Sequence, residues 1–183
     1  MNTVDASPIS PHDHAPVVRL TSHPAAPHRD HQKRESREGG EAPGAVTYGE
    51  CFAVQPFNNL VVTQTLTGAQ LKEVLEQQFP GYAGQTATRI LQVSAGFTYS
   101  YDSTLPGGQR MSNLALNGVP VDPATTYRVT TNDFLANGGD GFTNLSLGTN
   151  RSTAAGFDVD ALTTYLGSGP IAPGPANRIT RSA

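Results

Sequence analysis

The aromatic residues divide this chain into two unlike parts. All thirteen phenylalanine and tyrosine residues of the 183-residue sequence lie after residue 45, and all five histidines lie before residue 32. Residues 1–45 also hold six of the fourteen prolines and many charged residues. A segment of this composition buries too little apolar surface to offset the entropy lost on ordering. We therefore expect residues 1–45 to be a disordered, low-complexity tail and residues 46–183 to form one folded domain.

Charge and hydropathy exclude several classes of partner. The formal net charge of -3 argues against nucleic acid, because nucleic-acid binders normally carry a basic face. No apolar run approaches the length of a membrane span, so no membrane partner is expected, and the N-terminus lacks the apolar core of a signal peptide. The single cysteine, Cys51, cannot form an intramolecular disulfide and indicates no redox compartment.

Hydrophobic periodicity predicts a strand followed by a helix early in the folded part. Residues 60–66 alternate and are rich in β-branched side chains, which indicates a strand. Thr67 and Gln70 match a capping box, and the apolar stripe that follows predicts a helix ending at Pro80. The side chains expected on the outer face of this helix are Lys72, Glu73 and Glu76.

Further elements follow along the chain. Residues 91–101 alternate strictly and predict one long half-buried strand. Asn117-Gly118 is a strong hairpin signal, residues 127–131 read as a strand, and residues 143–157 read as polar and irregular. A second helix is expected over residues 159–166, capped by Asp158. Its inward side chains are expected to be Leu162, Tyr165 and Leu166. Strands separated by a few helices predict a mixed α+β domain.

The stretch from residue 132 to residue 142 suggests ligand binding. It places the Phe134 ring, three glycines and the Asp140 carboxylate close together after a strand. Glycine permits positive φ and close approach to the backbone, a carboxylate accepts hydrogen bonds from paired hydroxyls, and a ring stacks on a flat ligand. This combination suits a nucleoside. The alternative is a glycine-rich connection between strands with Phe134 and Phe142 buried.

Phe57 is the second ring that no periodic pattern explains. Pro56 has a fixed φ and keeps the preceding Gln55 extended, so Phe57 is expected on a bend. Two rings facing one another, Phe57 and Phe134, can sandwich a base. The alternative is that Phe57 is a core aromatic at the entrance of a strand.

No catalytic or metal site is predicted. The sequence contains no histidine beyond residue 31, and the five in the tail lack the spacing and scaffold of a metal site. Nucleophilic catalysis needs a nucleophile with an adjacent base, which the folded part does not offer. The glycines at 138, 139 and 141 lack the Lys and Ser/Thr of a phosphate-binding loop and the oxygen ladder of a calcium loop.

Residues 46–179 resemble the C-terminal domain of the 5′-nucleotidases. The stretches that carry the resemblance are 47–50, 52–57, 66–68, 91–94, 127–129, 132–142 and 175–179. The resemblance implies a layered α/β fold with a mixed sheet, in which Phe57 and Phe134 clamp the base of a nucleoside or nucleoside 5′-phosphate. It also implies that Asp140 accepts hydrogen bonds from the ribose hydroxyls and that Asn59 lies near the base.

The chain also departs from the family pattern. The family's two-metal phosphoesterase domain is missing, as is the Asn-x-Gly-Gly-(Ile/Val)-Arg segment that should precede Val46. We therefore expect a nucleoside-recognition domain of a nucleotide-hydrolysing enzyme that is not catalytically competent alone. Its two divalent metals belong to the missing domain, which a separate metallophosphoesterase domain can supply. The alternatives are a free-standing nucleotide-binding module and an inactive gene fragment. The family works mostly outside the cytoplasm, yet no export signal is recognisable in this sequence.

The composition break also suggests that residues 1–45 are not native family sequence, for example because of a frameshift or a misplaced start codon. Translating the upstream DNA in all three frames should then reveal metal-ligand motifs and a Gly-Gly-(Ile/Val)-Arg segment. If no frame encodes them, this hypothesis is wrong.

Overall fold

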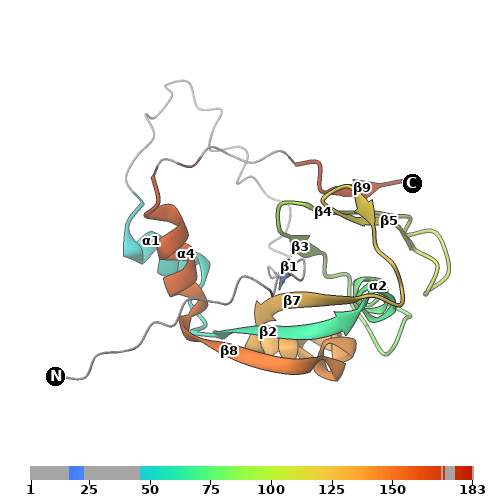
Figure 1. The fold of residues 1–183 in the computed structure, drawn as a ribbon, viewed down its shortest axis with the longest axis horizontal. Coiled ribbons are helices and arrows are strands. Elements are labelled where there is room, and N and C mark those ends of the chain that lie inside the picture. Colours follow the sequence, from blue (N-terminus) through green and yellow to red (C-terminus); the bar gives the residue numbers. More distant parts are fainter. Residues whose placement is uncertain (1–16, 23–45, 170, 172–175, 183) are drawn as a thin grey trace.

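The computed structural model describes residues 17–22, 46–169, 171 and 176–182. In this part of the chain two sheets and several helices form a mixed α+β fold, as predicted (Figure 1). The five-stranded sheet has the order β3 (Leu91–Val93), β1 (Val17–Ser22), β7 (Thr126–Asn132), β2 (Leu60–Thr67), β8 (Thr149–Phe157). The four-stranded sheet has the order β6 (Val119–Pro120), β5 (Met111–Leu116), β4 (Phe97–Tyr101), β9 (Ile179–Arg181). The helices are α1 (Tyr48–Val54), α2 (Gly68–Glu76), α3 (Asp133–Ala136) and α4 (Asp158–Leu166), with short 3₁₀ turns η1 (Gly139–Gly141) and η2 (Thr143–Leu147).

Local signals account for the β2–α2 unit and for the β5–β6 hairpin. In α2 the Thr67 side chain accepts the N–H of Gln70 at 3.1 Å, and the Gln70 side chain accepts the N–H of Thr67 at 2.8 Å, which confirms the capping box. Asn117 and Gly118 have φ of 51° and 79°, the left-handed pair of a two-residue hairpin turn. Both predictions are confirmed because they depend on residues adjacent in sequence.

The core lies among strands of both sheets and the inner face of α2. Its buried members are Val18, Leu20, Leu66, Leu71, Val74, Leu75, Phe79, Leu91, Val93, Phe97, Tyr99, Met111, Leu116, Tyr127, Val129, Leu135, Phe142 and Leu145. Burial raises the pKa of the Tyr99 hydroxyl, although its hydrogen bond to Gln78 acts in the opposite direction. The two sheets thus share one apolar interior.

The expectation that residues 1–45 are disordered is wrong for β1. Val17–Ser22 lies inside the larger sheet, parallel to β7 with Val18 opposite Val129 and antiparallel to β3 with Leu20 opposite Val93. Val18 and Leu20 are fully buried. The composition of residues 1–45 as a whole hides the apolar residues of this six-residue strand. Taken alone, the alternation around Val18 and Leu20 predicts a strand. The other residues of the segment lie outside the described part of the chain.

The single strand expected over residues 91–101 is two strands in different sheets. β3 pairs with β1, whereas β4 pairs with β5 and β9. Between them Gly96 has a φ of 88°, and a Cβ there would lie 2.3 Å from Oδ1 of Asn117. The alternation continues across the break because β3 and β4 both point their apolar side chains into the same core.

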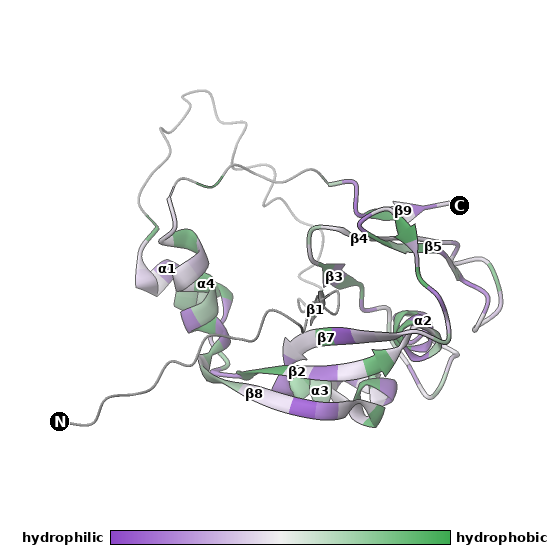
Figure 2. Ribbon diagram, in the orientation of Figure 1, coloured by the Kyte–Doolittle hydropathy of each residue, from purple (hydrophilic) through white to green (hydrophobic). Residues whose placement is uncertain are grey.

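Residues 143–157, expected to be irregular, form η2 and the edge strand β8. β8 pairs antiparallel with β2 through a bulged register, and every one of its residues is exposed. Figure 2 shows hydrophilic residues along its first half. An edge strand held by main-chain hydrogen bonds, with no buried face, carries no alternating pattern for sequence analysis to detect.

The helix expected over residues 159–166 is present as α4, but its packing differs from the expectation. Tyr165 is 60% exposed, and Val159 is the only buried residue of α4. The N-cap is Phe157, whose N–H donates to Oδ2 of Asp160 at 2.9 Å. α4 lies beside α1 beyond the ends of the strands (Figure 1), so most of its surface has no core to cover.

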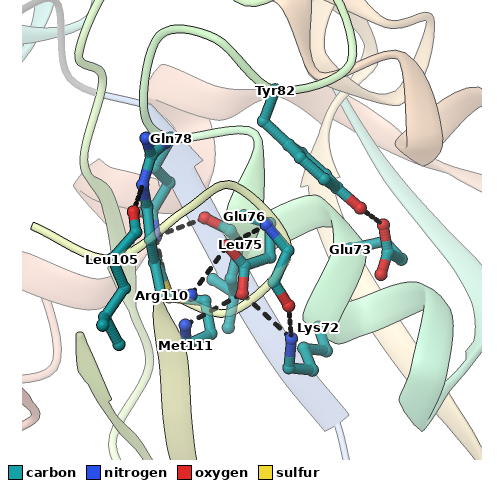
Figure 3. A network of polar contacts seen from close by, with 10 residues as sticks. Lys72, Glu73, Leu75, Glu76, Gln78, Tyr82, Leu105, Arg110 and Met111 are labelled. Atoms are coloured by element: carbon teal, nitrogen blue, oxygen red, sulfur yellow. Dashed lines mark hydrogen bonds and ion pairs between the residues drawn. The ribbon is translucent and has the colours of Figure 1, made fainter. Parts of the chain in front are cut away.

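Glu76 is fully buried, so its expected position on the outer face of α2 is wrong. Its carboxylate pairs with Nζ of Lys72 at 2.9 Å. It also accepts main-chain N–H groups from Gly108 at 3.1 Å, Arg110 at 3.2 Å and Met111 at 2.9 Å (Figure 3). A loop from the second sheet folds over the helix at this point, and Glu76 joins the two.

One turn earlier, Glu73 accepts a hydrogen bond from the Tyr82 hydroxyl (Figure 3). This bond, together with burial, raises the pKa of Tyr82 to about 12. Glu73 is half-buried and accepts this one hydrogen bond, whereas Glu76 is buried and accepts from Lys72 and three main-chain N–H groups.

Glu76→Gln should lower the free energy of unfolding by about 2 kcal/mol or more, because the amide lacks the charge that stabilises the bonds from Lys72 and three main-chain N–H groups, one buried and two part-buried. The matched change Glu73→Gln, which still accepts from Tyr82, should cost less than about 1 kcal/mol. Guanidinium unfolding followed by circular dichroism measures both. Equal losses in the two variants would contradict the assigned role of Glu76.

Candidate functional site

Antiparallel pairing brings the two ring-bearing segments to one end of the larger sheet. Val61 at the start of β2 lies opposite Asn132 at the end of β7. The main-chain N–H of Leu60 donates to Oδ1 of Asp133 at 3.1 Å, which ties the segment after Phe57 to the first residue of α3. Leu60 and Val61, which follow Phe57, therefore lie against Asn132 and Asp133, which precede Phe134.

Both rings that the sequence singles out are exposed. Phe57 is 64% exposed and Phe134 is 47% exposed, so the alternatives that made them core aromatics are wrong. Phe142 is fully buried, as that alternative expected for it. Asn132 caps α3 by accepting the N–H of Leu135 at 2.9 Å, and this short helix presents the Phe134 ring toward solvent while Leu135 enters the core.

Gly139 holds the Phe134 ring against the glycine-rich loop. A Cβ on Gly139 would lie 2.6 Å from two atoms of the Phe134 ring and 2.6 Å from its carbonyl oxygen. No side chain fits in this space, so the ring lies directly on the backbone next to Asp140. The structure therefore brings Phe134 and Asp140 together.

Asp140 has a φ of 55°, in the left-handed region, and lies between Gly138 and Gly141 with φ of 87° and 83°. Its side chain is 28% exposed, and Oδ1 lies 3.3 Å from Nε of Arg89. Sequence analysis did not single out Arg89, because nothing in the sequence places residue 89 beside residue 140.

Gln85 is a second residue that sequence analysis missed. It is 4% exposed, and its Nε2 donates to the carbonyl oxygen of Asp140 at 2.9 Å. Its Oε1 accepts from Nη1 of Arg89 at 3.1 Å. In the sequence it lies within the polar stretch 81–88, which reads as an ordinary loop.

Asn59 faces a different neighbour. Its Nδ2 donates to Oδ2 of Asp158 at 3.3 Å, and its carbonyl oxygen accepts the N–H of Asp158 at 2.8 Å. Asn59 thus connects the start of β2 to the start of α4, at the same end of the sheet as Phe57 and Asp133.

The described residues include no histidine and no group of three or more His, Cys, Asp or Glu side chains that could hold a metal ion. Within the same residues no helix is both long and apolar enough to cross a bilayer. The groups that the described residues place around residues 57–60 and 132–140 include exposed rings, carboxylates and the guanidinium groups of Arg89 and Arg151.

The described elements form an α+β domain that presents Phe57, Phe134 and Asp140 toward one end of its larger sheet. The family model described as "5'-nucleotidase, C-terminal domain" matches residues 31–146, and its start lies inside the segment that composition separates from the domain. The chain therefore belongs to the 5′-nucleotidase family and carries its C-terminal domain.

Individual relatives agree with this assignment. An apyrase from Tabanus yao is 35% identical over 147 residues, which are 74% of this chain and 26% of the relative. Protein UshA from Escherichia coli K12 is 32% identical over 133 residues, which are 73% of this chain and 22% of the relative. The crystal structure of a 5′-nucleotidase precursor from Thermus thermophilus is similar, with a TM-score of 0.70 and 31% identity over 90% of this chain and 31% of that protein. The chain thus spans about a quarter of the length of the curated relatives it matches.

Gly139→Ala should lower the free energy of unfolding by about 1–3 kcal/mol, because the added methyl group meets the Phe134 ring and carbonyl oxygen. Gly49→Ala is the matched control, since a Cβ there would meet nothing nearer than Oγ1 of Thr47 at 3.9 Å. In a helix this change should be neutral or stabilising by up to about 1 kcal/mol. Thermal or chemical unfolding measures both, and a neutral Gly139→Ala would contradict the packing described.

Proposed function

We propose that this domain recognises the nucleoside of a nucleoside 5′-phosphate for a 5′-nucleotidase-type phosphohydrolase. One observation carries the proposal: the exposed Phe134 ring lies on Gly139, beside Asp140, at the sheet end that also bears the exposed Phe57. The rings suit a flat base, and the carboxylate suits a ribose diol.

The rings supply affinity for the base. Stacking of a base on an aromatic side chain is worth roughly 1–3 kcal/mol, and two rings hold both faces of the base. An exposed ring has no competing role in the core, which supports a ligand-binding role for Phe57 and Phe134. Phe134 lies within α3, and Phe57 lies between α1 and β2, so both rings are attached near regular elements and ordering them on binding costs less entropy.

Asp140 supplies selectivity for the sugar. An ionised carboxylate accepts two hydrogen bonds from adjacent hydroxyls, and such charge-assisted bonds are stronger than neutral ones. The side chain of Asp140 is 28% exposed and so is accessible to a ligand. In this proposal Asn59 lies near the base. The hydrogen bond from its Nδ2 to Oδ2 of Asp158 orients its side chain.

Phosphate cleavage is assigned to a metallophosphoesterase domain of the family type, with two divalent metals. This division of labour is supported by the share of the relatives that the chain spans, about a quarter. A two-metal site stabilises the attacking and leaving oxygens of a phosphoryl transfer, which requires a cluster of His and Asp ligands.

Phe134→Ala and Phe57→Ala should each weaken adenosine binding by about tenfold or more, because each removes one stacking surface. Isothermal titration calorimetry with the full chain measures the affinity. Tyr165→Ala is the control, since this ring is 60% exposed but lies on α4. Wild-type protein that binds no adenosine, or two phenylalanine variants that bind as well as wild type, would overturn the proposal.

A further inference from the structure

Both polar atoms of the Gln85 side chain are hydrogen-bonded, and one of these bonds holds the backbone of Asp140. The two hydrogens of its Nε2 go to the carbonyl oxygens of Gln77 at 2.8 Å and Asp140 at 2.9 Å. Its Oε1 accepts the N–H groups of Thr86 at 3.0 Å and Ala87 at 3.2 Å. A buried amide with every donor satisfied is rigid, so Gln85 is a fixed support rather than a mobile side chain.

This support coincides with the unusual backbone of the loop. Asp140 and Gly141 both have positive φ, and a Cβ on Gly141 would lie 2.9 Å from Nε2 of Gln85. A non-glycine residue in the left-handed region is uncommon and persists where its surroundings hold it. The hydrogen bond from Gln85 to the Asp140 carbonyl holds the peptide between the two left-handed residues.

Arg89 extends the same support to the carboxylate. Its main-chain N–H donates to the carbonyl oxygen of Gln78 at 2.8 Å, which anchors residue 89 to the end of α2. Its Nη1 donates to Oε1 of Gln85, and its Nε lies 3.3 Å from Oδ1 of Asp140. The Asp140 side chain is 28% exposed, so a ligand hydroxyl can reach its carboxylate beside Arg89.

We propose that Gln85 and Arg89 are positioning residues that hold the Asp140 carboxylate in place for the ribose and thereby determine the preference for ligands with free 2′ and 3′ hydroxyls. Gln85 holds the backbone conformation of Asp140, and Arg89 engages one carboxylate oxygen and orients the group. The inference rests on the proposed role of Asp140 and adds two residues to it. Arg89 is one-third exposed, whereas Gln85 is buried, so the two can be altered with different structural consequences.

The test compares the affinity of the full chain for adenosine with that for 2′,3′-dideoxyadenosine, which keeps the base and lacks both hydroxyls. Wild type should prefer adenosine by about tenfold or more, the worth of hydrogen bonds to a charged group. Asp140→Asn should lose most of this preference.

Arg89→Gln should reduce the preference by about threefold or more while dideoxyadenosine binds within about twofold of wild type. Arg89→Lys, which keeps a cation near Asp140, should retain more of the preference than Arg89→Gln. Gln85→Leu should act in the same direction. A merely structural role would weaken both ligands alike, so the ratio separates positioning from loss of folding.

Two exposed residues outside the site supply the controls. Arg181→Gln, on β9, and Gln92→Leu, on β3, should leave both affinities unchanged. A wild-type ratio near one would overturn the proposed role of Asp140. A wild-type preference that Asp140→Asn abolishes but Arg89→Gln and Gln85→Leu both retain would overturn the present inference alone.

Discussion

The antiparallel pairing of β2 with β7 is the constraint on which the rest of the structure depends. Seven residue pairs run from Val61 opposite Asn132 to Thr67 opposite Thr126. At one end of this ladder the chain turns into α2 and the core. At the other end Leu60, three residues after Phe57, donates its N–H to Asp133, the residue before Phe134. A shift of the register by one residue would move every side chain of β2 to the other face, so burial of Val62 and Leu66 also holds the two ring-bearing segments in register.

Buried glutamines connect this ladder to the loops around it. Gln64 of β2 donates to the carbonyl oxygen of Leu145 at 2.7 Å, and Gln77 donates to Oγ1 of Thr143 at 2.7 Å. Gln85 reaches Asp140 in the same manner. An amide can donate and accept at once without the desolvation cost of a charge, which suits it to joining irregular backbone to a regular core. Buried glutamines therefore hold residues 140–145 from the core side. Residues 134–140 present the exposed Phe134 ring and the partly exposed Asp140 carboxylate on the outer side.

The chain carries the C-terminal domain of the 5′-nucleotidase family, which is one part of a longer protein in its relatives. The chain corresponds to about a quarter of its curated relatives, and its described residues offer rings, carboxylates and a guanidinium rather than a metal cluster. Recognition and bond cleavage make different physical demands: recognition needs a shaped surface that remains rigid, whereas cleavage needs ligands that concentrate positive charge on a phosphate. The proposed division of labour, with recognition on this domain and cleavage on another, would let each surface be organised around its own core.

The sequence by itself determined the elements and residues that depend on neighbours along the chain. These include the capping box of Thr67, the hairpin at Asn117-Gly118 and the bend that carries Phe57. Whether the rings of Phe57 and Phe134 are exposed was decided by the tertiary structure. The tertiary structure alone decided where β1 inserts, why residues 91–101 divide between two sheets, and why Glu76 is buried. It also decided that Gln85 and Arg89 lie beside Asp140. Local signals arise from backbone geometry and periodicity within a few residues, whereas these other features arise from contacts between segments whose spacing in the sequence has no period to reveal them.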